Sequence, residues 1–169
     1  METTRRLTPK ERAELYNKRF PTHPPLSFND RWITGAWYFW RSKAGKIYGS
    51  YPDTYLKRIY TLFPDCDKVL HLFSGSLSKG EKGIRFDINA DLNPDVCGDV
   101  RNLKSLFPFN SFELVIADPP YEMRDFEVYG YHLLKMWRVM KDLYPIVTPR
   151  GFVVWLDVII PMYTIKEWK

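Results

Sequence analysis

Residues 112–121 read Phe112-Glu113-Leu114-Val115-Ile116-Ala117-Asp118-Pro119-Pro120-Tyr121. A short apolar run that stops at a Pro-Pro pair predicts a buried strand with an abrupt end. The two prolines lack backbone N–H donors and restrict the chain, so the segment presents acceptors in a stiff geometry. Open α/β sheets bind ligands at the carboxyl ends of their strands, and this stretch therefore predicts both the fold class and the place of a site.

The four residues after the strand are suited to a planar group that carries an exocyclic amine. The Asp118 carboxylate and a prolyl carbonyl can accept its two N–H bonds, while the Tyr121 ring stacks on its face. An adenine or cytosine edge has this form. The alternative interpretation is a strand end followed by an ordinary Pro-Pro turn, which occurs in many folds.

Two further strands are expected upstream, each followed by small or acidic residues. The apolar run 68–73 breaks into Ser74-Gly75-Ser76, whose small side chains let a ligand approach the backbone. The run 83–88 contains Asp87 at its end, and Asp99 precedes a short helical stretch. Each acid can also be read as a loop cap, because Asp is favoured in turns.

The order of these motifs resembles the S-adenosylmethionine-dependent amino methyltransferases that act on adenine N6 or cytosine N4 in DNA. The resemblance covers about residues 48 to 160, and its most specific part is Asp118-Pro119-Pro120-Tyr121 combined with the Phe73-Ser74-Gly75 turn. Residues 48–56 are similar to the segment that precedes the first strand in this family, which gives a gamma-type motif order.

The resemblance implies an α/β, Rossmann-like methyltransferase fold with a doubly wound, mostly parallel sheet, minimal or truncated at the C-terminal hairpin. It implies S-adenosylmethionine as cofactor, S-adenosylhomocysteine as product, and no metal. The residues that it assigns to catalysis are Asp118, Pro119, Pro120 and Tyr121. The residues that it assigns to the cofactor are Tyr51, Pro52, Thr54, His71, Phe73, Ser74, Gly75, Ser76, Asp87, Ile88, Asp99, Val100 and Asp118.

Three features depart from the family pattern. The turn has no G-x-G, and only the ten residues 74–83 join the first two strands, so the crossover helix must shrink to a turn or disappear. The chain ends about ten residues after its last strand, so we expect either that the C-terminal hairpin is truncated or that a partner chain, a second copy or the amino-terminal segment covers the sheet edge. No stretch is long enough to form a separate target-recognition domain.

Nucleic acid, foremost DNA, is the expected substrate. RNA or a protein amide is the first alternative, and Asp118 favours DNA because relatives for the other targets often carry Asn there. The second alternative is a catalytically silent subunit that binds nucleic acid. The target base, the recognition sequence and the strandedness are left open.

Composition agrees with one globular domain. The chain has 169 residues, 45% of them hydrophobic, with two cysteines and three histidines, which argues against a disulfide scaffold or structural zinc. No leader-like h-region opens the sequence, and no apolar stretch approaches the ~18 residues of a membrane span. We therefore expect a cytoplasmic protein with no membrane partner.

Positive charge is concentrated near the amino terminus. Residues 1–60 hold 12 Lys and Arg against 5 Asp and Glu, a net of +7, and the remainder carries −2. Aromatic and basic residues alternate at 31–32, 37–41 and 43–48, a pattern that suits stacked bases and phosphates but also a packed flap. We expect a basic segment with a Pro-rich linker at 1–30 and the methyltransferase domain at 31–169.

Periodicity and caps predict the remaining elements. Helices are expected at 8–19, opened by Thr8 and Pro9, at 53–63, and from about 125 to 144, the last with an apolar stripe that includes Met136, Trp137 and Met140. Residues 149–151 should turn the chain into a strand at 152–158.

Overall fold

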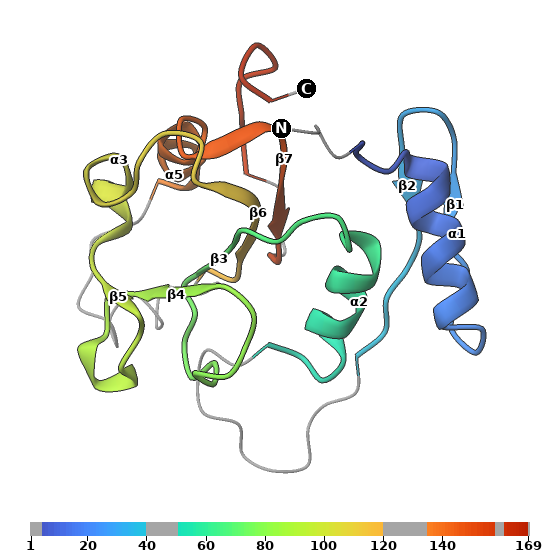
Figure 1. Ribbon diagram of the computed structural model, residues 1–169, viewed down its shortest axis with the longest axis horizontal. Helices are drawn as coiled ribbons and strands as arrows, with labels where there is room; N and C mark the ends of the chain where they lie inside the picture. Colours follow the sequence, from blue (N-terminus) through green and yellow to red (C-terminus); the bar gives the residue numbers. More distant parts are fainter. Residues whose placement is uncertain (1–4, 40–50, 120–134, 158–160, 169) are drawn as a thin grey trace. The chain divides into compact units, whose positions relative to one another are not determined.

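The computed structural model describes residues 5–39, 51–119, 135–157 and 161–168, which form two compact units (Figure 1). The described part of the first unit is 5–39 and 51–66, and that of the second is 67–119, 135–157 and 161–168. The expected boundary at residue 30 thus falls inside the first unit. Within the described residues, no helix combines the length and the hydropathy needed to cross a membrane.

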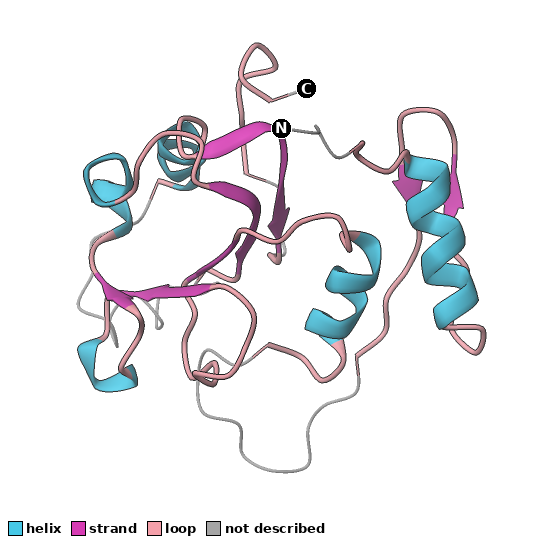
Figure 2. Cartoon of the chain, in the orientation of Figure 1, coloured by secondary structure: helices cyan, strands magenta, loops and turns pink. Residues whose placement is uncertain are grey.

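The second unit is built on a parallel sheet, shown as magenta arrows in Figure 2. In the described residues its order is β5-β4-β3-β6-β7. The strands are β3 (Val69–Leu72), β4 (Ile84–Asp87), β5 (Val96–Cys97), β6 (Phe112–Ala117) and β7 (Val147–Trp155). The predicted α/β class is therefore confirmed, as are the strands expected at 68–73, 83–88 and 112–117. The short β5 was not predicted, since two residues after a proline give no periodic signal.

Strand β7 begins earlier than the sequence suggested. Val147 pairs with Phe112, and Phe152 pairs with Leu114, so residues between them bulge out of the ladder. Arg150 has a φ of 65° in this bulge. The turn expected at 149–151 is therefore an irregularity within one strand rather than the connection before it.

One face of the sheet carries the main core of the second unit. Apolar side chains of β3, β4 and β6 meet the helices α3 (Leu103–Leu106) and α5 (Met136–Leu143). Lys104 and Asp142 join these two helices by an ion pair of 2.7 Å. The buried members of this core are Leu70, Leu72, Phe86, Val100, Leu103, Phe107, Phe112, Val115, Ala117, Val139, Met140, Leu143, Ile146 and Val147.

Helix α5 confirms the carboxyl end of the helix predicted to about 144, and residues 125–134 lie outside the described ranges. The predicted stripe is only partly right. Met140 is buried, but Trp137 is 45% exposed, and Val139 and Leu143 take its place in the core. Trp137 was included because it is apolar, although its angular position on the helix lies off the buried face.

The connection from β3 to β4 contains no helix, as its ten residues predicted. A buried arginine on β4 holds it instead. Arg85 donates from Nη1 to the Leu77 carbonyl at 3.1 Å and from Nη2 to the Asn93 carbonyl at 2.9 Å. Its Nε and Nη2 also bond the Asp95 carboxylate at 3.1 and 2.8 Å. One side chain thus ties the connections before and after β4 together.

The first unit comprises α1 (Pro9–Arg19), the hairpin β1 (Ser27–Phe28) and β2 (Ile33–Thr34), and α2 (Tyr55–Leu62). The helices expected at 8–19 and 53–63 are confirmed. Thr8 and Glu11 form a capping box, in which the Thr8 Oγ1 accepts the Glu11 N–H at 3.3 Å and the Glu11 carboxylate accepts the Thr8 N–H at 2.8 Å. Arg12, which sequence reasoning missed, is buried and bonds both Asp65 oxygens at 2.7 and 2.8 Å.

Candidate functional site

The carboxyl ends of β3, β4 and β6 lie at one edge of the sheet because all three strands are parallel. Strand β3 comes first in this sheet; the chain then adds β4 and β5 on one side of it and β6 and β7 on the other. The boundary between β3 and β6 is therefore the point where the strand order reverses. Ligands of open α/β sheets bind at such a switch point.

The turn after β3 has an unusual backbone. Phe73 and Gly75 adopt φ angles of 60° and 52°, in the left-handed region. Glycine takes this conformation freely, but for a bulky residue it costs roughly 1–2 kcal/mol. The Ser74 N–H donates to the Phe86 carbonyl at 3.0 Å, so the turn leans toward β4. Strain of this kind accumulates where a backbone must approach a ligand.

Ser74 lies within this turn and is 1% exposed. Its hydroxyl has no hydrogen-bond partner among the residues that the structure describes. Leaving a buried hydroxyl unsatisfied costs about 1–3 kcal/mol. A polar group that enters between the ends of β3 and β4 would satisfy it.

Asp87, the last residue of β4, shapes the same turn. Its Oδ2 accepts the Gly75 N–H at 2.8 Å, and its Oδ1 accepts the Asn89 N–H at 2.9 Å. An ionised carboxylate has about four acceptor positions, so two remain for further donors such as hydroxyls. Ile88 follows, half-buried. Ser76 is exposed, beyond the buried part of the turn.

Asp118 and Pro119 continue β6 beyond its pairing with β3. Leu72 pairs with Ala117, and the Asp118 N–H donates to the Leu72 carbonyl at 3.3 Å. Asp118 therefore lies one residue beyond the last β3–β6 pair, next to the carboxyl end of β3. Asp118 is half-buried and Pro119 is buried. Pro120 and Tyr121, the other two predicted catalytic residues, lie outside the described residues.

Asp99 and Val100 occupy different settings. Asp99 caps the 3-10 helix η2 (Val100–Asn102), and its Oδ1 accepts the Arg101 N–H at 2.8 Å. Its carboxylate also pairs with the Arg101 guanidinium, and this hydrogen bonding lowers the pKa of Asp99. Val100 is buried in the core. Asp99 thus has the geometry of a loop cap, with its charge engaged by Arg101.

His71 is the third residue of β3, and its side chain bonds to the connection that leads into β4. Its Nε2 is 2.8 Å from the carbonyl oxygen of Lys82, which precedes β4. The imidazole is fully buried, and this burial lowers its pKa. The structure therefore places the His71 side chain as a neutral link between β3 and the β3–β4 connection.

Tyr51, Pro52 and Thr54 belong to the first unit, where they lead into α2. The Tyr51 ring stacks on that of Tyr55 with centroids 5.4 Å apart. The Pro52 carbonyl accepts the Tyr55 N–H at 3.1 Å, and the Thr54 carbonyl accepts the Arg58 N–H at 3.0 Å. Thr54 has a φ of 67°.

The edge of the sheet thus gathers Phe73, Ser74, Gly75, Asp87 and Asp118, which the sequence had singled out. The His71 side chain is engaged by the Lys82 carbonyl. Arg85, which organises both connections around β4, was missed, because an arginine inside a predicted strand gives no sign of which carbonyls it will bond. No group of three or more His, Cys, Asp or Glu side chains in the described ranges could hold a metal ion.

Comparison with family models, with curated proteins and with solved structures finds no match to this chain.

Proposed function

We propose that this protein transfers a methyl group from S-adenosylmethionine to the exocyclic amine of a nucleobase, adenine N6 or cytosine N4, in DNA, on a Rossmann-like methyltransferase fold. The observation that carries the proposal is the meeting of three motifs at the switch point of the sheet. The turn with Ser74, the acid Asp87 and the acceptor pair at Asp118 come from three strands, and the chain brings them to one edge.

The residues at this edge fit the cofactor chemically. The buried hydroxyl of Ser74 needs a partner, and the amino-acid end of the cofactor offers both donors and acceptors. Asp87 retains acceptor positions for ribose hydroxyls. Gly75 adopts the left-handed conformation and has no side chain, so the turn leaves room for a ligand to approach its backbone. Asp99 contributes least to the fit, since Arg101 already engages its carboxylate.

Bound at this edge, S-adenosylmethionine supplies a methyl group already activated by its sulfonium. An aryl amine is a poor nucleophile because its lone pair delocalises into the ring. The Asp118 carboxylate and the Pro119 carbonyl would accept hydrogen bonds from the two amine N–H groups, favour a tetrahedral nitrogen and stabilise the positive charge that develops on it. As the nitrogen–methyl bond forms, the methyl–sulfur bond breaks, S-adenosylhomocysteine leaves, and the nitrogen releases one proton to solvent. Alignment of this kind can lower a barrier by about 7 kcal/mol or more. The family resemblance implies that Tyr121 would stack on the target base.

The test combines two measurements on the full chain. Calorimetry with S-adenosylmethionine measures cofactor binding, and transfer of labelled methyl to pools of DNA, RNA and protein measures activity. We expect labelled DNA from the wild type and none from Asp118→Ala. Asp67→Asn is the matched control, because Asp67 is an exposed acid that precedes β3 at the other end of the strand and pairs only with Lys82 in the described residues.

A second candidate is a catalytically silent subunit that keeps the fold and binds nucleic acid. The engagement of Asp99 by Arg101 favours it, because one predicted cofactor contact is then already used. Binding of the cofactor without transfer to any pool would support this candidate. If the labelled methyl group appeared in RNA or protein and not in DNA, the proposed chemistry would stand and the substrate would change. If the protein did not bind the cofactor, the enzyme proposal would be refuted.

A further inference from the structure

The first unit separates its aromatic residues into a packed set and an exposed set. Trp37 stacks on Tyr16 at 5.5 Å between centroids, with the Arg58 guanidinium 5.5 Å from its ring centroid. Phe39 packs its edge against Tyr55 at 5.9 Å. Tyr16 and Tyr55 are buried and Trp37 and Phe39 are half-buried, so these four rings pack against one another within the first unit. Trp32, in contrast, is 66% exposed.

Trp32 sits at the tip of the β1–β2 hairpin on a fixed backbone. The Asn29 Oδ1 accepts the N–H groups of Arg31 and Trp32 at 2.9 and 2.8 Å, and the Asn29 N–H donates to the Trp32 carbonyl at 2.9 Å. The hairpin is tied to α1 by two hydrogen bonds between the Asn17 amide group and the backbone of Leu26, at 2.7 and 3.0 Å. A backbone held in this way loses little conformational entropy when a ligand binds at the tip.

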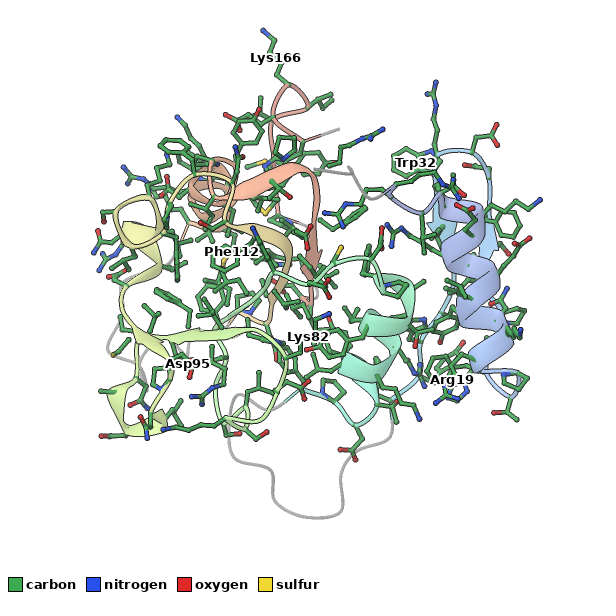
Figure 3. All side chains as sticks on the ribbon, in the orientation of Figure 1. Arg19, Trp32, Lys82, Asp95, Phe112 and Lys166 are labelled. Carbon is green, nitrogen blue, oxygen red and sulfur yellow. The ribbon has the colours of Figure 1, made fainter. Side chains whose placement is uncertain are left out.

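The surroundings of Trp32 are polar and the charge of the unit is positive. Asn29, Asp30 and Arg31 are all exposed beside it. Elsewhere in the unit Glu11 pairs with Arg5, and Asp65 pairs with Arg12. The exposed cations that form no ion pair within the described residues are Lys18, Arg19, Arg31 and Lys57. Figure 3 shows Trp32 and Arg19 at opposite ends of α1, so Arg31 is the cation that lies beside the ring in the chain, and Lys18 and Arg19 belong to the far end of the helix.

We propose that this tip, Arg31 with Trp32, is a stacking site for an unpaired base of single-stranded DNA. Trp32, 66% exposed, offers a base a flat face, and the adjacent Arg31 can neutralise a phosphate, which is how proteins hold single strands; Phe28, 40% exposed in the same hairpin, adds aromatic surface. A protein partner would instead require a larger contiguous apolar centre. The choice of DNA rests on the proposed function, but the stacking itself does not require methyl transfer.

The test uses the full chain without cofactor and a fluorescein-labelled 20-nucleotide DNA strand, followed by anisotropy. Base stacking on an aromatic ring is worth about 1–3 kcal/mol, so Trp32→Ala should weaken binding by about 5- to 150-fold. Trp32→Tyr should retain most of the affinity. Arg31→Ala should weaken binding and reduce the salt slope by about 0.7. The matched control is Trp137→Ala, which removes another half-exposed tryptophan from the second unit and should leave the affinity unchanged.

An unchanged affinity in Trp32→Ala would overturn the inference, as would failure of the wild type to bind the single strand. The inference would also fail if the wild type bound a duplex equally well and that binding did not depend on Trp32. Because Trp32 is largely exposed, circular dichroism should show Trp32→Ala folded. The two proposals can fail separately. Loss of methyl transfer in Asp118→Ala with unchanged strand binding tests catalysis alone, and Trp32-dependent binding by a chain without transferase activity would leave the stacking site standing.

Discussion

Replacing Arg85 by Met should destabilise the second unit more than any comparable change to an exposed arginine. The Arg85 side chain is 3% exposed and donates four hydrogen bonds. Met fills a similar volume but leaves the Leu77 and Asn93 carbonyls without this donor, at about 1 kcal/mol each. Asp95, with 42% of its side chain exposed, can rehydrate, so we assign its loss about 1 kcal/mol. The expected total is about 3 kcal/mol.

Urea unfolding followed by circular dichroism measures this loss. With a slope of about 2 kcal/mol per molar urea, the midpoint should fall by about 1.5 M. Arg101→Met is the control, because Arg101 is an exposed arginine whose ion pair with Asp99 lies at the surface, and its midpoint should shift by less than about 0.5 M. Figure 3 marks Asp95, the acid of the Arg85 network, for comparison. Equal midpoints for the two variants would refute the idea that Arg85 substitutes for the missing crossover helix.

Three further outcomes are expected. Phe73→Gly should be about 1 kcal/mol more stable than Phe73→Ala, because Phe73 has a φ of 60°; the opposite order in urea unfolding would count against a left-handed backbone there. Ser74→Ala should leave the free energy of unfolding unchanged or raised, yet weaken calorimetric binding of S-adenosylmethionine by about 5- to 10-fold, the worth of one hydrogen bond; a stability loss with unchanged binding would make Ser74 structural. The pKa of His71 is lowered by burial from its ordinary 6.5, so the unfolded chain binds a proton that the folded chain does not. The free energy of unfolding should therefore decrease as the pH is lowered below about 6.5, by up to about 1.4 kcal/mol per pH unit. His71→Gln should flatten that pH dependence.

Patterns that depend on short stretches of sequence predicted most of the fold. The run 112–117 matches β6 residue for residue, and Thr8 with Pro9 predicted the start of α1. The ten-residue link between β3 and β4 was too short for a helix, as expected. The bulge at Arg150 and the exposure of Trp137 were not foreseen, because both depend on which neighbouring strand or helix a residue faces.

The site was predictable only in part, and for a physical reason. Residues that end strands are brought together by parallel pairing, so Ser74, Asp87 and Asp118 meet at one edge. The sequence could not show that Arg101 would engage the Asp99 carboxylate or that His71 would bond the Lys82 carbonyl. A side chain with several possible hydrogen-bond partners forms a particular bond only in the folded chain, and the spacing along the sequence does not predict which partner it bonds.

Mass spectrometry of nucleosides tests the central claim most directly. DNA incubated with the protein and S-adenosylmethionine that carries a deuterated methyl group is digested, and the bases are analysed. The proposal predicts deuterated N6-methyladenine or N4-methylcytosine from the wild type and from Asp67→Asn, and neither from Asp118→Ala. Absence of both bases in every sample, together with no calorimetric binding of the cofactor, would contradict it.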